Sequence, residues 1–295
     1  MKLEIKNLSK KYSNGVQALD NVSLSIGHGM FGLLGQNGAG KSTLMRTIAT
    51  LQEADSGSIR FGDIDVLSQP QQMRKILGYL PQEFGVYPGV SAEELLLHIA
   101  DMKGVENRSE RKEIVEALLE KVNLYQVRKK RLSTYSGGMK QRFGIAQTLL
   151  ANPEIIIVDE PTAGLDPMER NRFYNLLSEI GENTVVILST HIVEDVSTLC
   201  NEMAIIGKGK VLATGKPVGI EAALKGKVWE KEINKSELPR YENQYQVISS
   251  RLHLGKMLIT VLDETLVDDS FREKAPSLED AYFATIKESG ELVSP

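Results

Sequence analysis

A nine-residue glycine-rich stretch constrains the fold of this chain more than any other part of its sequence. It reads Gly35-Gln36-Asn37-Gly38-Ala39-Gly40-Lys41-Ser42-Thr43 and fits the pattern G-x-x-x-x-G-K-[ST]. The apolar residues 30–34 before it are typical of a buried strand, and residues 42–51 after it have helical character. We therefore expect a strand, a tight loop and a helix in that order.

This loop has the chemistry of a phosphate site. Its three glycines let the backbone N–H groups turn inward, and the helix that follows adds the partial positive charge of its N-terminus. Lys41 would place a cation on the β- and γ-phosphates of a nucleotide. The Ser42 hydroxyl is a hard oxygen that suits Mg²⁺, and Thr43 would add a phosphate contact. We expect ATP and Mg²⁺ here.

Two acids follow the buried run at residues 155–158. Asp159 and Glu160 would stand at the carboxyl end of this strand, where the ligands of parallel sheets bind. Asp159 suits Mg²⁺ through a water molecule. Because side chains alternate along a strand, we expect Glu160 to point elsewhere and to act as the general base on an attacking water. Solvated acids at a strand end are the alternative.

His191 follows the next apolar strand, in Ser189-Thr190-His191. A histidine there could donate a hydrogen bond to the γ-phosphate or position the water, and we name it with Glu160 and Lys41 as a candidate catalytic residue. Taken alone, such a histidine is more often structural.

The apolar pattern indicates an α/β fold. Residues 1–30 are expected to form an antiparallel opening that turns at Asn14-Gly15. Ser91 and Glu94 form a capping box for a helix over 91–103. The elements expected after it are helices at 109–122, 136–151 and 167–180 and strands at 154–158 and 184–189. Alternation of strands and helices implies a parallel sheet.

The last part of the chain has a different pattern. Strands are expected at 228–233, 245–254 and 256–262, and residues 277–287 place Leu278, Ala281, Tyr282, Thr285 and Ile286 on one helical face. We interpret residues 1–220 as one domain and 226–295 as a small β-rich accessory domain that ends in a docking helix.

Composition excludes several classes of protein. A formal net charge of -4 argues against a nucleic-acid partner, and a single cysteine, Cys200, rules out an intramolecular disulfide. The longest aliphatic runs fall far short of the ~20 residues of a membrane-spanning helix. The first residues lack the apolar core of a signal peptide. A cytosolic protein is the default expectation.

With these residues assembled, the chain resembles the nucleotide-binding domain of ABC transporters over about residues 1–220. The resemblance implies an ABC-type P-loop NTPase fold with a mixed sheet core, an antiparallel β subdomain and a helical subdomain at about 85–150. It implies that Tyr12 stacks on adenine, that Gln82 senses Mg²⁺ and the membrane partner, and that Gly164-Leu165-Asp166 contacts a second subunit.

Residues 135–142, Tyr-Ser-Gly-Gly-Met-Lys-Gln-Arg, look like the family signature Leu-Ser-Gly-Gly-Gln. Ser136, Gly137 and Gly138 are intact, and their place at a helix start suits a γ-phosphate. Tyr135 and Met139 depart from the pattern, which puts in doubt the contact that the usual glutamine makes. In this family one subunit's signature closes over the other's ATP, so a head-to-tail dimer is implied, and we favour a homodimer.

Residues 277–283, Ser-Leu-Glu-Asp-Ala-Tyr-Phe, are similar to an ending common in ATPases of the ABC-2 exporter group. The resemblance implies ATP-driven export through a separate permease, with this protein held at the inner face of the cell membrane. Residues 83–89 are our candidate groove for the permease. The alternatives are a non-transport ABC ATPase, a tandem translation-type ATPase, which would need a second glycine loop, and a module that binds ATP without cleaving it.

Overall fold

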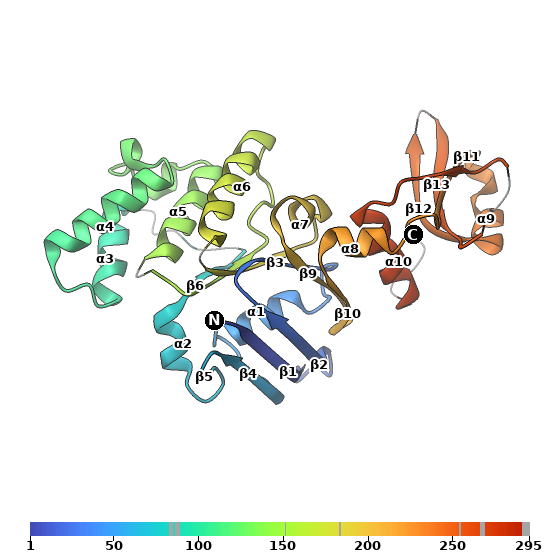
Figure 1. Cartoon of the computed structure of the whole chain (residues 1–295). Helices are drawn as coiled ribbons and strands as arrows, with labels where there is room; N and C mark the ends of the chain where they lie inside the picture. The colour runs from blue at the N-terminus through green and yellow to red at the C-terminus, as the bar shows by residue number, and fades with distance from the viewer. Residues whose placement is uncertain are drawn as a thin grey trace.

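The computed structural model describes residues 1–82, 85, 89–150, 152–182, 184–253, 255–265 and 269–290. Within these ranges the chain forms three β-sheets. In Figure 1 a central sheet lies between an antiparallel sheet below and a group of helices above, while a third sheet stands apart to the right.

The central sheet has six strands and is mostly parallel. Every neighbouring pair is parallel except β9 with β10. All residues of β7 and β8 are buried, as expected for strands covered on both faces. The predicted parallel sheet is confirmed. In spatial order, its strands are β10 (Lys210–Gly215), β9 (Glu202–Gly207), β3 (Gly29–Leu34), β8 (Val185–Thr190), β7 (Ile155–Asp159) and β6 (Leu77–Leu80).

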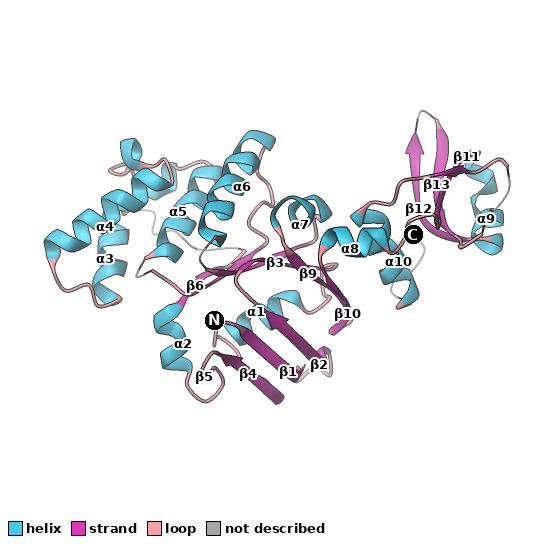
Figure 2. Cartoon of the chain, in the orientation of Figure 1, coloured by secondary structure: helices cyan, strands magenta, loops and turns pink. Residues whose placement is uncertain are grey.

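Alternate residues of β7 enter two separate cores because strand side chains point to opposite faces in turn. Ile155 and Ile157 pack with helix α1 (Lys41–Ile48) on one face. Ile156 and Val158 pack on the other face. The helices of this second face include α5 (Gly137–Leu149), α6 (Pro167–Gly181) and α7 (Val193–Leu199). Figure 2 shows the resulting helix and strand layers.

The antiparallel sheet begins with the predicted hairpin. Strands β1 (Leu3–Lys11) and β2 (Gln17–Ile26) pair, and Tyr12 N donates to Val16 O at 2.9 Å across the turn. The sequence pattern left residues 52–80 unassigned. They form the rest of this sheet, one helix and β6. The elements are β4 (Ser56–Phe61), β5 (Ile64–Asp65) and α2 (Pro70–Ile76).

Two further helices, α3 (Ala92–Met102) and α4 (Arg108–Lys121), pack against α5 at the left of Figure 1. The predicted capping box is confirmed, since Glu94 N donates to Ser91 Oγ and Ser91 N donates to Glu94 Oε2 at 2.9 Å. The hydrogen bonds that the backbone N–H and the hydroxyl of Ser91 donate to the Glu94 carboxylate lower the pKa of Glu94. Short 3₁₀ turns lie at Tyr125–Val127, Leu132–Thr134 and Lys235–Glu237.

The third sheet is fully antiparallel and contains the three strands predicted for this region. Helix α9 (Leu238–Gln244) packs against it, and Trp229, Tyr241, Tyr245 and Phe271 belong to its small core. In spatial order, its strands are β12 (Gln246–His253), β13 (Lys256–Leu262), β11 (Val228–Ile233) and β14 (Arg272–Glu273).

Helix α10 (Leu278–Glu288) joins the third sheet to the main core. Leu278, Tyr282 and Ile286 belong to the same core as α5, α6 and α7. The helix also contacts β12 and α8 (Pro217–Ala222). The helix thus packs on the main core. The division into domains at residues 220 and 226, with this helix as the docking end of an accessory domain, stays a prediction. Among the described residues, no helix has the length and apolar character needed to cross a membrane.

The docking of α10 can be tested by removing one of its core side chains. Ile286 is fully buried, so Ile286→Ala should lower the free energy of unfolding by about 2–5 kcal/mol. Leu252→Ala is the control, because Leu252 is 66% exposed. It should change stability by less than about 0.5 kcal/mol. Denaturant unfolding of both variants measures the difference, and equal stabilities would contradict the packing.

Candidate active site

The glycine loop connects β3 to α1 and curves around a cavity. Gly38 and Gly40 have φ values of 83° and 107°, which residues other than glycine rarely adopt. A Cβ on Gly40 would also lie 2.4 Å from the Ala18 carbonyl oxygen. The cavity has a volume of about 390 Å³. Most of the predicted site residues line it: Tyr12, Gln36, Asn37, Gly38, Gly40, Lys41, Ser42, Thr43, Gln82 and Glu160.

Gly35 and Ala39 support the loop from behind. A Cβ on Gly35 would lie 2.4 Å from the Ile206 carbonyl oxygen, so the backbone of β9 packs directly on this position. Ala39 is buried, and its carbonyl accepts a hydrogen bond from Gly209 N at 2.9 Å. These two residues therefore fix the shape of the loop, and the residues between and after them face the cavity.

Lys41 holds the loop together through its side chain. The Lys41 side chain is only 4% exposed, and its ammonium group donates to the carbonyl oxygens of Gly35 at 2.7 Å and Gln36 at 3.1 Å. Burial lowers the pKa of Lys41, while the Glu160 and Asp159 carboxylates act in the opposite direction. The charge of Lys41 is thus placed at the floor of the cavity, where a phosphate would meet it.

Three of the predicted site residues lie against the carboxylate of Glu160. This carboxylate accepts a hydrogen bond from Gln82 Nε2 at 3.1 Å and lies 3.6 Å from Lys41 Nζ. His191 Nδ1 lies 3.2 Å from the same carboxylate. Glu160 is 7% exposed. The structure therefore gathers the three candidate catalytic residues, together with Gln82, at one position beside the loop.

Asp159 and Glu160 contact different partners, as expected. The cause is not the alternation of side chains along a strand. Strand β7 ends at Asp159, and Glu160 has a φ of 47°, in the left-handed region. This turn carries the Glu160 side chain toward the loop. Asp159 stays in the strand, is 3% exposed, and accepts a hydrogen bond from the hydroxyl of Ser189, its register partner on β8.

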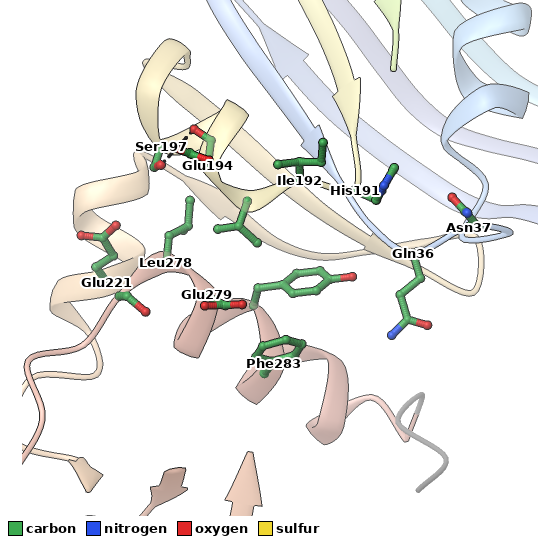
Figure 3. A pocket seen from close by; sticks show the side chains of 13 residues that line it. Gln36, Asn37, His191, Ile192, Glu194, Ser197, Glu221, Leu278, Glu279 and Phe283 are labelled. Carbon is green, nitrogen blue, oxygen red and sulfur yellow. Dashed lines mark hydrogen bonds between the residues drawn. The ribbon is translucent and has the colours of Figure 1, made fainter. Parts of the chain in front are cut away.

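His191 is the most open of these residues, with 43% of its side chain exposed. Figure 3 shows it beside Gln36 and Asn37 along a groove of about 790 Å³. Helix α10 forms the opposite wall of this groove, where Phe283 is seen below His191. His191 can therefore reach a group held at the outer side of the glycine loop.

The Tyr12 hydroxyl is engaged by the protein. It donates to Gln52 Oε1 at 2.9 Å and lies 3.1 Å from Thr43 Oγ1. These bonds fix the ring at the edge of the cavity, which its side chain lines. Stacking on adenine and a phosphate contact from Thr43 both stay predictions.

The signature residues lie elsewhere in the chain. Ser136 caps α5, and its Oγ accepts a hydrogen bond from Met139 N at 3.2 Å. Among the described residues that line the glycine-loop cavity, Ser136, Gly137 and Gly138 are absent. A single copy of the chain therefore does not bring its two predicted phosphate-binding segments together.

Tyr135, which stands where the usual signature has leucine, packs into the main core. Tyr135 is 4% exposed in the main core, and its hydroxyl donates to the Val127 carbonyl at 3.0 Å. Burial raises the pKa of Tyr135. This side chain therefore packs inward, as the leucine of the usual signature is expected to do. Met139 is partly buried against the same core.

Known proteins of similar sequence and fold belong to one family. The family model of ABC transporters matches residues 19–163. The uncharacterized ABC transporter ATP-binding protein YxlF of Bacillus subtilis is 31% identical over 96% of this chain and 99% of its own length. The linearmycin resistance ATP-binding protein LnrL of the same organism is 35% identical over 76% of this chain and 72% of its own.

This chain belongs to the ATP-binding proteins of ABC transporters. It is therefore an ATPase. A solved dimeric structure of the ATP-binding cassette MJ0796, in a post-hydrolysis state with ADP and Pi, matches with a TM-score of 0.67 at 26% identity. The match covers 72% of this ABC ATPase and 98% of that chain. ABC ATPase domains form dimers and work with membrane permeases.

Sequence analysis missed residues that brace this ABC ATPase site. Glu169 lies against the signature, since a Cβ on Gly138 would meet its carboxylate at 2.6 Å. Glu169 also lies 3.4 Å from Arg142. Arg142 ends the stretch that resembles the signature, whereas Glu169 belongs to no predicted motif. The close spacing of Asp166 and Glu169 at the start of α6 is a local signal only for a helix cap, which is what Asp166 forms.

The conformation of Gly40 gives a test of the loop. Gly40→Ala should destabilise the protein by about 1–3 kcal/mol and weaken ATP binding, because the new methyl group meets the Ala18 carbonyl in a strained backbone. Gly27→Ala is the control, because its Cβ would have no neighbour within 4 Å. Calorimetric ATP titration and thermal unfolding measure both effects. Wild-type affinity in Gly40→Ala would contradict the assigned loop geometry.

Proposed function

We propose that this ABC ATPase is the energy-supplying subunit of an exporter. It binds ATP with Mg²⁺, closes head-to-tail with a second copy of itself and drives a separate membrane permease. The observation that carries the proposal is the meeting of Lys41, Gln82 and His191 on the Glu160 carboxylate. A buried carboxylate held beside a phosphate-binding loop has the position that a general base for water requires.

The residues at the cavity fit a magnesium ion. Ser42 lines the cavity and supplies a hard oxygen atom, whereas Asp159 is buried at the end of β7, outside the cavity lining, and would reach the ion through a water molecule. Gln82 donates its amide N–H to Glu160, which leaves its amide oxygen for the ion. Mg²⁺ prefers few protein ligands and keeps several waters. When bound, it would draw negative charge from the β- and γ-phosphates.

Binding of ATP would change the contacts of Lys41, Glu160 and His191 in turn. The γ-phosphate takes the place of Glu160 as the anionic partner of Lys41. Glu160 is then available to accept a hydrogen bond and a proton from the attacking water. His191, which neighbours Glu160 and borders the outer side of the loop, contacts the γ-phosphate or the water.

A second copy would complete the site. The glycine-loop cavity of one copy lacks Ser136, Gly137 and Gly138, while the chain carries both halves intact. The N-terminus of α5 offers free amide groups to a γ-phosphate of the partner. A homodimer would thus contain two complete sites, with Tyr12 stacked on each adenine.

Export is supported by the relatives and by the chain's ending. LnrL is a resistance protein by name, and residues 277–283 of this chain resemble the ending of ABC-2 exporter ATPases. The protein would work at the inner face of the cell membrane, held there by its permease. Within the proposed permease groove at 83–89, residues 83, 84 and 86–88 lie outside the described part of the chain.

The role of Glu160 predicts a loss of turnover. Glu160→Gln keeps the size of the side chain but removes the base, so ATP hydrolysis should fall by about 100-fold or more. Glu154→Gln, at an exposed position before the same strand, is the matched control and should hydrolyse ATP normally. Phosphate release measures both. Undiminished turnover in Glu160→Gln would refute the assigned base.

We expect the Glu160→Gln protein to remain a dimer when MgATP is bound. Glu160→Gln should hold ATP without cleaving it, so light scattering should show the mass double when MgATP is added and return when Mg²⁺ is chelated. Adding Ser136→Ala and Gly137→Glu to this variant places a side chain and a negative charge where the partner's phosphate would sit, and should prevent the doubling. A mass that stays monomeric in both proteins would contradict nucleotide-driven dimerisation of the isolated subunit.

A further inference from the structure

A buried aspartate lies behind the proposed catalytic residues. Asp195, in α7, is fully buried. Its Oδ2 accepts hydrogen bonds from Thr162 Oγ1 at 2.6 Å and from Thr190 Oγ1 at 2.8 Å. Its Oδ1 accepts one from the Tyr174 hydroxyl on α6 at 2.5 Å. The three hydroxyl groups come from three separate segments of the chain.

Two of these segments carry the proposed catalytic side chains. Thr162 lies two residues after Glu160, in the turn that leaves β7, and Thr190 lies directly before His191. Both threonines are 1% exposed. Thr190 Oγ1 also accepts a hydrogen bond from Ile192 N at 2.9 Å, so this hydroxyl spans the backbone on both sides of His191.

A single oxygen atom therefore joins the two segments. Because Thr162 and Thr190 donate to the same Oδ2, neither can move away without leaving a buried carboxylate short of a donor. Hydrogen bonds to an ionised carboxylate are about twice as strong as neutral ones. This link acts together with the bond from Glu160 N to Ser189 O at 2.9 Å, which joins the same strand ends.

We infer that Asp195 is a positioning residue, which holds the turn after Glu160 and the segment around His191 as one body. It touches neither side chain and acts through Thr162 and Thr190. Its effect is to keep the Glu160 carboxylate and the His191 ring at their 3.2 Å separation while nucleotide binds. The inference rests on the proposed roles of these two residues in hydrolysis.

The test removes the two threonine hydroxyls at constant volume. Thr162→Val and Thr190→Val should each lower kcat by at least about tenfold, since small displacements of catalytic groups are costly. KM for MgATP should change by less than about twofold, because the glycine loop is untouched. Asp195→Asn, which replaces one acceptor oxygen by a donor, should lower kcat in the same way.

Thr148→Val is the matched control. Thr148 is 3% exposed in α5, and its hydroxyl donates to Ile145 O at 2.7 Å, away from the site. Thr148→Val also loses a buried threonine hydrogen bond, here to a backbone carbonyl, and should keep kcat. Thermal unfolding of every variant shows how much stability each lost bond supplied. Thr162→Ser and Thr190→Ser keep the hydroxyl and should restore kcat to within about twofold of the wild-type value.

The outcomes separate this inference from the proposed function. Valine variants whose kcat equals that of Thr148→Val, beside an inactive Glu160→Gln protein, would overturn the positioning role alone. A loss of kcat that only follows the loss of thermal stability, or that serine does not restore, would overturn it as well. Full turnover in Glu160→Gln would instead refute the assigned base.

Discussion

The buried charge of Lys41 is the constraint on which the rest of the site depends. Its ammonium group lies under the glycine loop, bonded to the carbonyls of Gly35 and Gln36 and 3.6 Å from Glu160. Breaking such a pair leaves an uncompensated charge, which costs more than the pair contributes. The loop must therefore curve to supply its carbonyl oxygens, and the turn after β7 must present the carboxylate. A bound phosphate could take the place of the Glu160 carboxylate as the partner of Lys41, and the lysine would stay buried.

Features governed by neighbouring residues could be predicted from the sequence. The glycine loop, the buried strand at 155–158, the capping box at Ser91 and the three longer strands of the third sheet all follow from local chemistry and spacing. The same holds for the approach of Glu160 to His191, since the carboxyl ends of adjacent parallel strands meet at one edge. Motif spacing was enough to place these residues.

Features that depend on distant partners could not be predicted. The contact of Glu169 with Gly138 joins two helices about thirty residues apart, and no pattern in either helix signals it. The left-handed backbone at Glu160 is a property of one turn and breaks the rule of strand alternation. Residues 52–80 form short strands of two to six residues, which are too brief for a clear period.

Helix α10 has a consequence for the biosynthesis of the protein. Leu278, Tyr282 and Ile286 complete a core whose other members, in β3, β9 and α7, are synthesised much earlier. Domains form during translation from the N-terminus onward, at about 5–20 residues per second. Until α10 emerges, the apolar surface that receives it is open to water. A chain that stopped short of this helix would leave that surface exposed even when the third sheet was complete.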